Sequence, residues 1–180
     1  MTDSVAILRT YDEAWNRLRG RLDGLEDHEF FWEPVPDGWS LRPGPGGTWT
    51  IDGEGGGGPT PDPVPFTTIA WRLAHVGLTL VDFRERYFAD RVIDLDDVTL
   101  PGSAQASITF VTEAYSQWRD DIDALPPEAW TSTIGEHFGP YQDDSTTDLV
   151  LHVLDEFVHH SAEVGVLRDL YLYRHAFKAD

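Results

Sequence analysis

The sequence predicts an all-α protein, a bundle of four long helices that forms a single domain over residues 1–180. Apolar residues recur at helical spacing in four separate segments of the chain. Prolines and glycines gather in the connections between those segments, where they stop helices. The chain has 180 residues, of which 41% are hydrophobic, and that is enough for a sizeable core.

The first helix is predicted over residues 3–25 and the second over residues 66–90. The second helix carries a main apolar face and, beside it, a narrower stripe that contains Trp71, His75 and Leu78. Such wide apolar coverage is typical of a helix that is buried on more than one side, as in a bundle that also dimerises.

Two loop-rich segments make up most of the connection between these helices. Residues 28–43 contain three prolines and four aromatic residues, a composition that predicts an ordered loop packed over the bundle. Residues 43–65 are rich in glycine and proline and include the run Gly55–Gly58. We expect residues 34–65 to be a loop or insert with 43–65 as its least structured part. That part would be either a mobile lid or, as is commoner for loops, an insertion without a role.

The third helix is predicted over residues 104–125, because two prolines follow it directly. A loop over residues 128–143 comes next, and His137 within it is a candidate for contact with a substrate. We expect this loop and the one at 34–65 to shape a pocket. The last residues of the chain, 174–180, are expected to fray.

The fourth helix, residues 146–171, carries a stripe of ionisable side chains that overlaps its apolar face. Asp144 or Ser145 is expected to cap its start. On a helical wheel Glu156 and His160 lie deepest in the overlap, and His159 lies farthest out. The whole stripe consists of His152, Glu156, His159, His160 and Glu163.

Glu156 and His160 are four residues apart, so their side chains stack on one face of the helix, a spacing that can hold a metal ion. An ionisable pair on a buried face needs its charge compensated, which a divalent cation would do. The other interpretation is a plain helix whose His and Glu residues lie at a wet rim or form ordinary ion pairs. His75, a lone histidine in mid-helix, is more often a hydrogen-bonded core or rim residue. In a bundle, however, it could meet Glu156 and His160.

Charge and cysteine content exclude several classes of function. The formal net charge is −19, which argues against nucleic acid and membrane surfaces as partners because both would repel the chain. The absence of cysteine excludes thiolate catalysis, cysteine zinc sites and disulfides, and it fits a reducing cytoplasm. No apolar run approaches the ~20 residues of a membrane span, and the N-terminus lacks a signal peptide's apolar core. We therefore expect a cytoplasmic protein.

Four stretches of the chain carry a family resemblance. They are FFWEPVPDGWSLRP after the first helix, IAWRLAHVG in the second, LPPEAW at the end of the third and HVLDEFVHHSAEVGVLRDLY in the fourth. Together they resemble the DinB-like superfamily of metal-binding four-helix bundles, which includes mycothiol-dependent maleylpyruvate isomerases and YfiT-like hydrolases. The first and last stretches are similar to the actinobacterial branch in particular, and the glycine-rich insert is the main part without a match.

The resemblance implies an up-down-down-up order of helices and a homodimer. It also implies a zinc or nickel site made by one His of the second helix and two His four residues apart on the fourth. His75 and His160 match the first and last of these ligands, and Glu156 stands where the family has a His. A His-Glu-His set still suits a divalent ion, although the harder carboxylate makes manganese or iron less easy to exclude. Glu163 and His159 would lie around the ligands as candidates for a general base.

Two classes of function follow. In the first, a metal-dependent enzyme acts on a small-molecule substrate. Because the chain has no cysteine, the nucleophile would be water, as in a hydrolase, or a low-molecular-weight thiol such as mycothiol, as in a thiol S-transferase; the resemblance favours the thiol. In the second, a stress-associated bundle binds a metal or small ligand without catalysis. The Glu at position 156 also fits a third case, a family member whose site has decayed.

Overall fold

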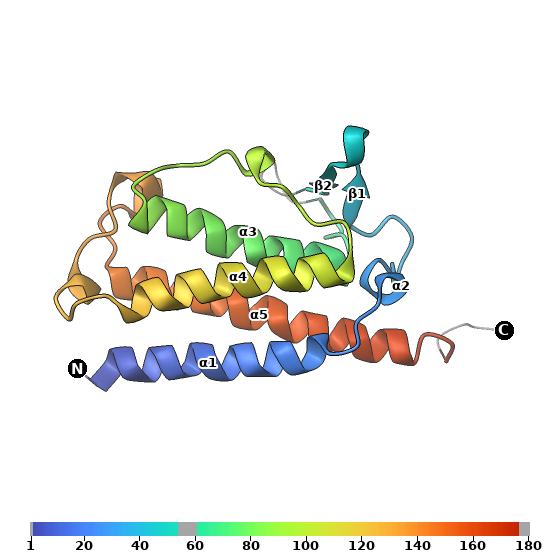
Figure 1. Ribbon diagram of the computed structural model, residues 1–180, viewed down its shortest axis with the longest axis horizontal. Coiled ribbons are helices and arrows are strands. Elements are labelled where there is room, and N and C mark those ends of the chain that lie inside the picture. Colours follow the sequence, from blue (N-terminus) through green and yellow to red (C-terminus); the bar gives the residue numbers. More distant parts are fainter. Residues whose placement is uncertain (1, 54–60, 177–180) are drawn as a thin grey trace.

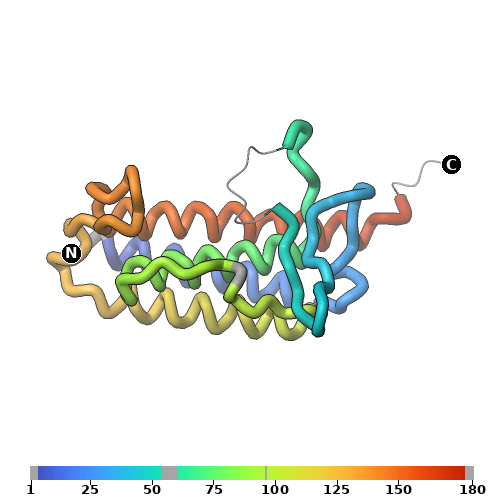
Figure 2. Tube along the Cα trace, turned by 90° about the horizontal axis from the view of Figure 1, so that it is seen from above, coloured from blue at the N-terminus to red at the C-terminus, as the bar shows by residue number. Residues whose placement is uncertain are grey.

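The computed structural model describes residues 2–53 and 61–176, and four long helices account for most of them (Figure 1). These helices are α1 (Thr2–Leu22), α3 (Ile69–Phe88), α4 (Ala104–Asp123) and α5 (Thr146–Leu172). They lie side by side in both views, so the predicted all-α bundle is confirmed (Figures 1 and 2). The predicted up-down-down-up order is confirmed too. Helices α1 and α5 run in one direction and α3 and α4 in the other, and residues 89–103 return across the bundle.

A single cluster of buried side chains fills the space between the four helices. Its largest fully buried members include Tyr11 of α1, Trp118 of α4 and Phe157 of α5. The Tyr11 hydroxyl donates a hydrogen bond of 2.7 Å to the carbonyl oxygen of Val150, which joins α1 to α5 inside the core. Helix α3 packs against both α4 and α5, and His75 in the middle of α3 lies against Glu156 of α5. This arrangement places the candidate ligands on facing helices.

Of the two residues predicted to cap the start of α5, Ser145 is the one that does so. Ser145 is the N-cap, its hydroxyl accepts a hydrogen bond from the Asp148 backbone N–H, and the Asp148 carboxylate accepts one from the Ser145 N–H in return. This reciprocal capping box satisfies two backbone donors that the helix itself leaves without partners.

Four of the predicted helix boundaries are wrong by two or three residues. Helix α1 ends at Leu22 rather than at residue 25, because Gly24 adopts a positive φ of 68° and turns the chain. Helix α3 starts at Ile69 rather than at residue 66, because Thr67 forms a parallel bridge with Trp39. Helix α3 also stops at Phe88 and α4 at Asp123, in each case two residues early.

The prediction of loops over residues 28–43 and 34–65 is also wrong in part. The first segment begins within a short helix, α2 (Asp27–Phe30), and the second contains an antiparallel hairpin of β1 (Leu41–Pro43) and β2 (Trp49–Ile51). The turn between the strands is a 3₁₀ helix, η1 (Pro45–Gly47). Strands of three residues are too short to show an alternating pattern in sequence. The run Gly55–Gly58 lies outside the described residues.

One side chain holds this hairpin region together. Arg42 on β1 donates hydrogen bonds to the Glu33 carboxylate at 2.6 Å, to the Asp52 carboxylate at 2.8 Å and to the Gly38 carbonyl oxygen at 2.6 Å. Three acceptors around one planar guanidinium fix the start, the middle and the end of the segment relative to one another. The segment is therefore ordered through its own polar contacts.

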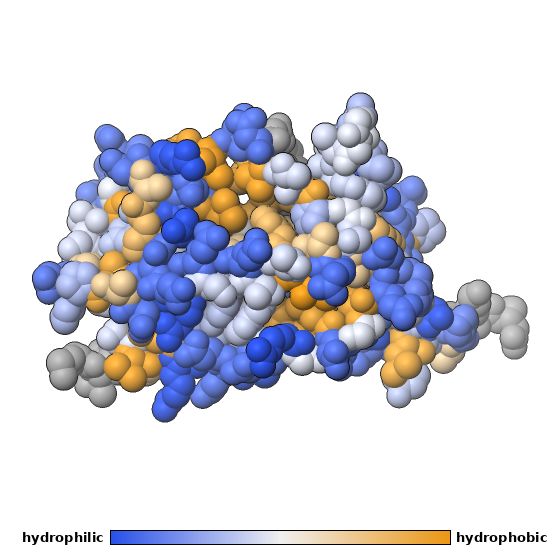
Figure 3. Space-filling model, viewed as in Figure 1, coloured by the Kyte–Doolittle hydropathy of each residue, from blue (hydrophilic) through white to orange (hydrophobic). Residues whose placement is uncertain are grey.

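At the opposite end of the bundle the chain between α4 and α5 forms two 3₁₀ helices, η3 (Ala129–Thr131) and η4 (Glu136–Tyr141). The connection that crosses the bundle from α3 to α4 contains another 3₁₀ helix, η2 (Leu95–Asp97). The face of the molecule seen in Figures 1 and 3 is mainly hydrophilic, with separate apolar patches between the hydrophilic residues (Figure 3). Across the described part of the chain, every helix is too short or too polar to cross a membrane.

Candidate metal centre

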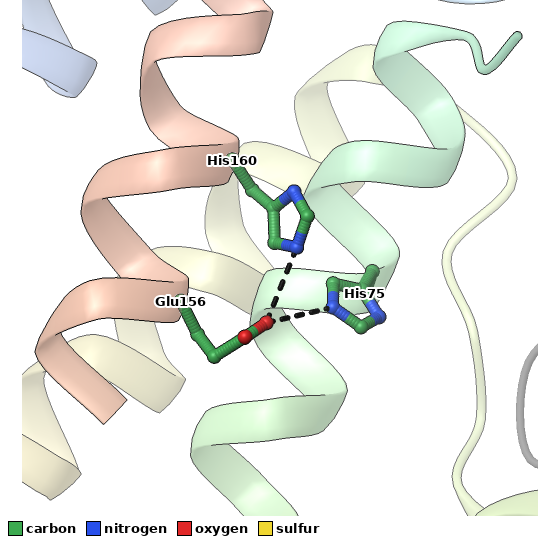
Figure 4. A group of neighbouring side chains, drawn as sticks. All are labelled: His75, Glu156 and His160. Carbon is green, nitrogen blue, oxygen red and sulfur yellow. Dashed lines mark ion pairs between the residues drawn. The ribbon is translucent and has the colours of Figure 1, made fainter. Parts of the chain in front are cut away.

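The structure brings His75, Glu156 and His160 together between α3 and α5 (Figure 4). Glu156 Oε2 lies 3.5 Å from His75 Nε2 and 3.2 Å from His160 Nε2. The side chains are 17%, 33% and 12% exposed for His75, Glu156 and His160 in turn. His75 comes from the middle of α3, and the other two residues lie one turn apart on α5, so the three donors converge from two facing helices.

These donor atoms fit a divalent metal ion. One nitrogen or oxygen from each residue lies within 4.8 Å of the other two. Two ligands that each bind one tetrahedral ion at about 2.0–2.2 Å lie roughly 3.4 Å apart. The observed separations of 3.5 Å and 3.2 Å are close to that value. Imidazole nitrogen and carboxylate oxygen are both ligands of zinc and nickel, so the chemistry of the donors agrees with the spacing.

A second carboxylate orients the ring of His160. Glu163 Oε2 lies 2.7 Å from His160 Nδ1, on the side of the ring away from Glu156. A metal-binding histidine commonly donates its other ring N–H to a carboxylate, which fixes both the tautomer and the ring orientation. In the tautomer whose Nδ1–H donates to Glu163, the lone pair of His160 Nε2 points at the space that His75 and Glu156 share.

Arg72 lies on the same side of His160 as Glu163. Its Nη1 is 3.0 Å from His160 Nδ1, and its Nε is 3.0 Å from Glu163 Oε2. Burial lowers the pKa of Arg72, and the nearby charges of Glu163 and Glu156 only partly oppose that shift. Burial also raises the pKa of Glu163, but the hydrogen bond from His160 and the charges of Arg72, His160 and His159 outweigh it, so the net shift is downward.

An aromatic stack supports His75 from the other side. The rings of Trp71 and His75 are nearly parallel, with centroids 4.8 Å apart and planes 13° apart. Trp39, just before β1, stacks on Trp71 at 6.0 Å. The indole Nε1–H of Trp71 donates a hydrogen bond of 2.7 Å to the carbonyl oxygen of Asp52, just after β2. The hairpin region is thus in contact with the residue that packs on a candidate ligand.

The other predicted site residues lie at different distances from this centre. His159 is 63% exposed at the rim, with Nε2 3.4 Å from Glu163 Oε1. His152 packs edge-on against Phe83 at 5.6 Å. His137 lies on η4 and pairs with Asp90 at 3.0 Å, at the end of the bundle away from the hairpin. The prediction that the 128–143 loop shapes the pocket is therefore not supported by this contact.

Sequence reasoning missed Arg72 and Asp52 as neighbours of the site. A signal for Arg72 exists, because it is a cation in an otherwise apolar part of α3 and precedes His75 by one turn. An apolar cavity too small to hold a water molecule adjoins the centre, lined by Val76, Thr79, Leu80, Val153, Glu156, Phe157 and His160. The candidate ligands Glu156 and His160 therefore border tightly packed apolar side chains.

Comparison with known proteins supplies the family. Searches of the curated proteins and of the solved structures gave no match. A family model described as the DinB superfamily matches residues 10–164, a span that runs from α1 to α5 and includes all three candidate ligands. That match covers most of the chain, and it agrees with the helical bundle and with the resemblance in the sequence. The chain belongs to the DinB superfamily.

Proposed function

We propose that the chain is a divalent-metal-dependent enzyme whose ion is held by His75 Nε2, Glu156 Oε2 and His160 Nε2. The observation that carries the proposal is that Glu156 Oε2 lies 3.5 Å from His75 Nε2 and 3.2 Å from His160 Nε2, close to the separation of two ligands on one ion. Membership of a superfamily that is generally metal-binding supports it. Zinc and nickel are the ions we expect first, since both accept two imidazoles and a carboxylate.

Bound at these residues, the ion would supply Lewis acidity that lowers the pKa of water or of a thiol and makes it a nucleophile near neutral pH. Three protein ligands leave at least one position for that molecule. The chain has no cysteine of its own, so the nucleophile is either water or a low-molecular-weight thiol such as mycothiol. The proposed reactions are therefore hydrolysis or transfer of a thiol to a small-molecule substrate.

The surrounding residues divide the remaining tasks. Glu163 holds the ring of His160, and its lowered pKa makes it a weak base near neutral pH. We therefore assign orientation of His160 to Glu163. His159 is exposed at the rim and is the better candidate for a general base that exchanges protons with solvent. Trp71 covers one face of the His75 ring and keeps water from that side.

A substrate screen tests this proposal. Chain loaded with zinc or nickel is incubated with a panel of esters and amides, and separately with low-molecular-weight thiols and electrophiles. We expect turnover that disappears in Glu156→Ala and persists in Asp155→Ala, which removes an exposed carboxylate beside it. The absence of turnover on every substrate by fully metal-loaded chain would contradict the enzymatic proposal.

A binding protein without catalysis is the second candidate. Glu156 contacts the imidazoles of both His75 and His160, and protonated histidines would make those contacts ion pairs without any metal. Metal-free chain that keeps its full folding stability and binds a small apolar molecule would favour this candidate.

The expected partners are also part of the proposal. We propose a small-molecule substrate, a homodimer and a cytoplasmic setting, with no nucleic acid or membrane partner. The net charge of −19 supports the two exclusions by repulsion. Light scattering coupled to size exclusion would test the dimer, with a mass twice the 20.3 kDa of one chain as the expected result.

A further inference from the structure

His160 faces possible metal ligands on both of its ring nitrogens. Its Nε2 faces Glu156 on the side of the proposed centre. Its Nδ1 faces Glu163, and Glu163 in turn contacts His159. Donor atoms of His159, His160 and Glu163 lie within 4.8 Å of one another, as those of the first group do. Two imidazoles and a carboxylate thus occur twice, on opposite sides of one ring.

The second group already surrounds a cation, the guanidinium of Arg72. Its nitrogens approach both His160 Nδ1 and Glu163 Oε2 at 3.0 Å. The side chain is 17% exposed, and its Cζ lies 4.8 Å from the centroid of the Trp71 ring, which holds the guanidinium in place. A guanidinium keeps its charge and has no lone pair for a metal, so an ion cannot share this space with it.

We propose that His159, His160 and Glu163 form a second site for a divalent ion such as zinc or nickel, and that Arg72 fills it and thereby directs metal to the Nε2 side of His160. A neutral imidazole offers one lone pair, so the two sites compete for the same ring. Arg72 fills the space in which an ion would reach Nδ1, and Glu163, by accepting the Nδ1–H, leaves the lone pair of the ring on Nε2. The role of Arg72 in directing metal rests on the proposed function, whereas the second site itself does not.

The two sites also differ in access. His159 is 63% exposed and Glu163 is 33% exposed, so the second site opens to solvent, whereas His75 at the first is 17% exposed. An ion at the second site would be reached from solvent more directly than one at the first. Holding metal at the first site instead places it next to the apolar cavity that His160 and Glu156 line. Arg72 thus separates a sheltered position from an exposed one.

The test uses chains in which the first site is disabled by Glu156→Ala. Four proteins are equilibrated with zinc, desalted and measured for metal content by plasma mass spectrometry: Glu156→Ala alone, and Glu156→Ala combined with Arg72→Met, with Arg72→Lys, or with Arg72→Met and Glu163→Gln. Methionine fills much of the space of the arginine without its charge, and lysine keeps the charge. We expect about one zinc per chain with Arg72→Met and close to none in the other three.

Two results would overturn the proposal. One is a Glu156→Ala, Arg72→Met chain without metal; the other is metal in that chain which Glu163→Gln does not remove. Arg72→Gln serves as a second neutral replacement, and circular dichroism with a thermal melt establishes that each chain is folded. If the parent chain binds no zinc but the Glu156→Ala, Arg72→Met chain does, the proposed function is contradicted while the second site is supported. Failure of the proposed function can therefore be told apart from failure of the second site.

Discussion

Each end of the bundle carries a loop-rich segment that contains aromatic residues, but only one of the two segments contacts the candidate metal centre. At the hairpin end, Trp39 and Asp52 contact Trp71, which stacks on His75. At the far end, η3 packs on α5 and η4 packs on α3. His75 lies about 9 Å from the first residue of α3, whereas His160 lies roughly 21 Å from the first residue of α5.

The difference shows that a loop-rich segment affects the site only where one side chain links the two, not simply because the segment lies near a site helix in the sequence. Trp71 makes that connection because it points toward the hairpin with its N–H and toward His75 with its ring face. At the far end the polar contacts are of another kind. The hydroxyl of Thr147 donates to the carbonyl oxygen of Trp130 at 2.7 Å, which fixes the start of a helix. The first end orients a candidate ligand, and the second anchors the fold.

The largest expected contrast comes from removing one buried indole at each end. Trp71 and Trp130 are 6% and 8% exposed, so Trp71→Ala and Trp130→Ala should each lower the free energy of unfolding by about 3–5 kcal/mol. Only Trp71→Ala should also weaken metal binding, by about 10–100-fold, because it removes the support of His75. Zinc affinity by competition with a chelator measures this. Equal affinities in the two variants would break the comparison.

A smaller contrast comes from two glycines that both have positive φ. Gly53 at the hairpin end has φ 70° and Gly135 at the far end has φ 90°. An added Cβ would overlap the Trp39 ring at Gly53 and meets open space at Gly135. Gly135→Ala should cost about 1–2 kcal/mol from the backbone alone, and Gly53→Ala should cost more. Only Gly53→Ala should alter tryptophan fluorescence and zinc affinity. If both substitutions change fluorescence and affinity equally, the packing of Gly53 against Trp39 does not matter to the site.

Loss of one helix cap at each end should have a smaller effect still. Thr68 caps α3 and Ser145 caps α5, each by accepting a hydrogen bond from a backbone N–H. Replacing either by alanine should lower the free energy of unfolding by about 1 kcal/mol in urea titrations. We expect Thr68→Ala to weaken zinc binding slightly, because the N–H it holds is that of Trp71, and Ser145→Ala to leave it unchanged. A weaker zinc affinity in Ser145→Ala would contradict this.

The smallest effect belongs to Glu163 and appears only in acid. Its folded-state pKa lies below the ordinary 4.5, so its contribution to stability is present above that pH and is lost as pH falls through the folded-state value. Urea unfolding of metal-free chain between pH 7 and pH 3 should therefore show a shallower acid loss in Glu163→Gln than in the parent. The same acid slope in both proteins would mean that His160 and Arg72 do not hold this carboxylate.

Periodicity was enough to predict the four helices, because each has an apolar face that repeats with the helical turn. It also predicted that Glu156 and His160 share a face, since both lie on one helix. His75 lies on a different helix, so grouping it with them rested on the predicted bundle, in which facing helices can share a site, and on the family resemblance. Arg72 and His160 are 88 residues apart, and no pattern along the chain carries a contact over that separation. The hairpin escaped prediction because its strands have three residues each.

Metal content is the most direct test of the central claim that His75, Glu156 and His160 hold one divalent ion. Tag-free parent chain, Glu156→Ala and His160→Ala are equilibrated with zinc or nickel, desalted and measured by plasma mass spectrometry. Asp155→Ala and His152→Ala serve as matched controls on the same helix, since both of these side chains lie on its exposed face. We predict about one ion per chain in the parent and both controls, and close to none in the two site variants. A parent without metal, or site variants that keep it, would contradict the account.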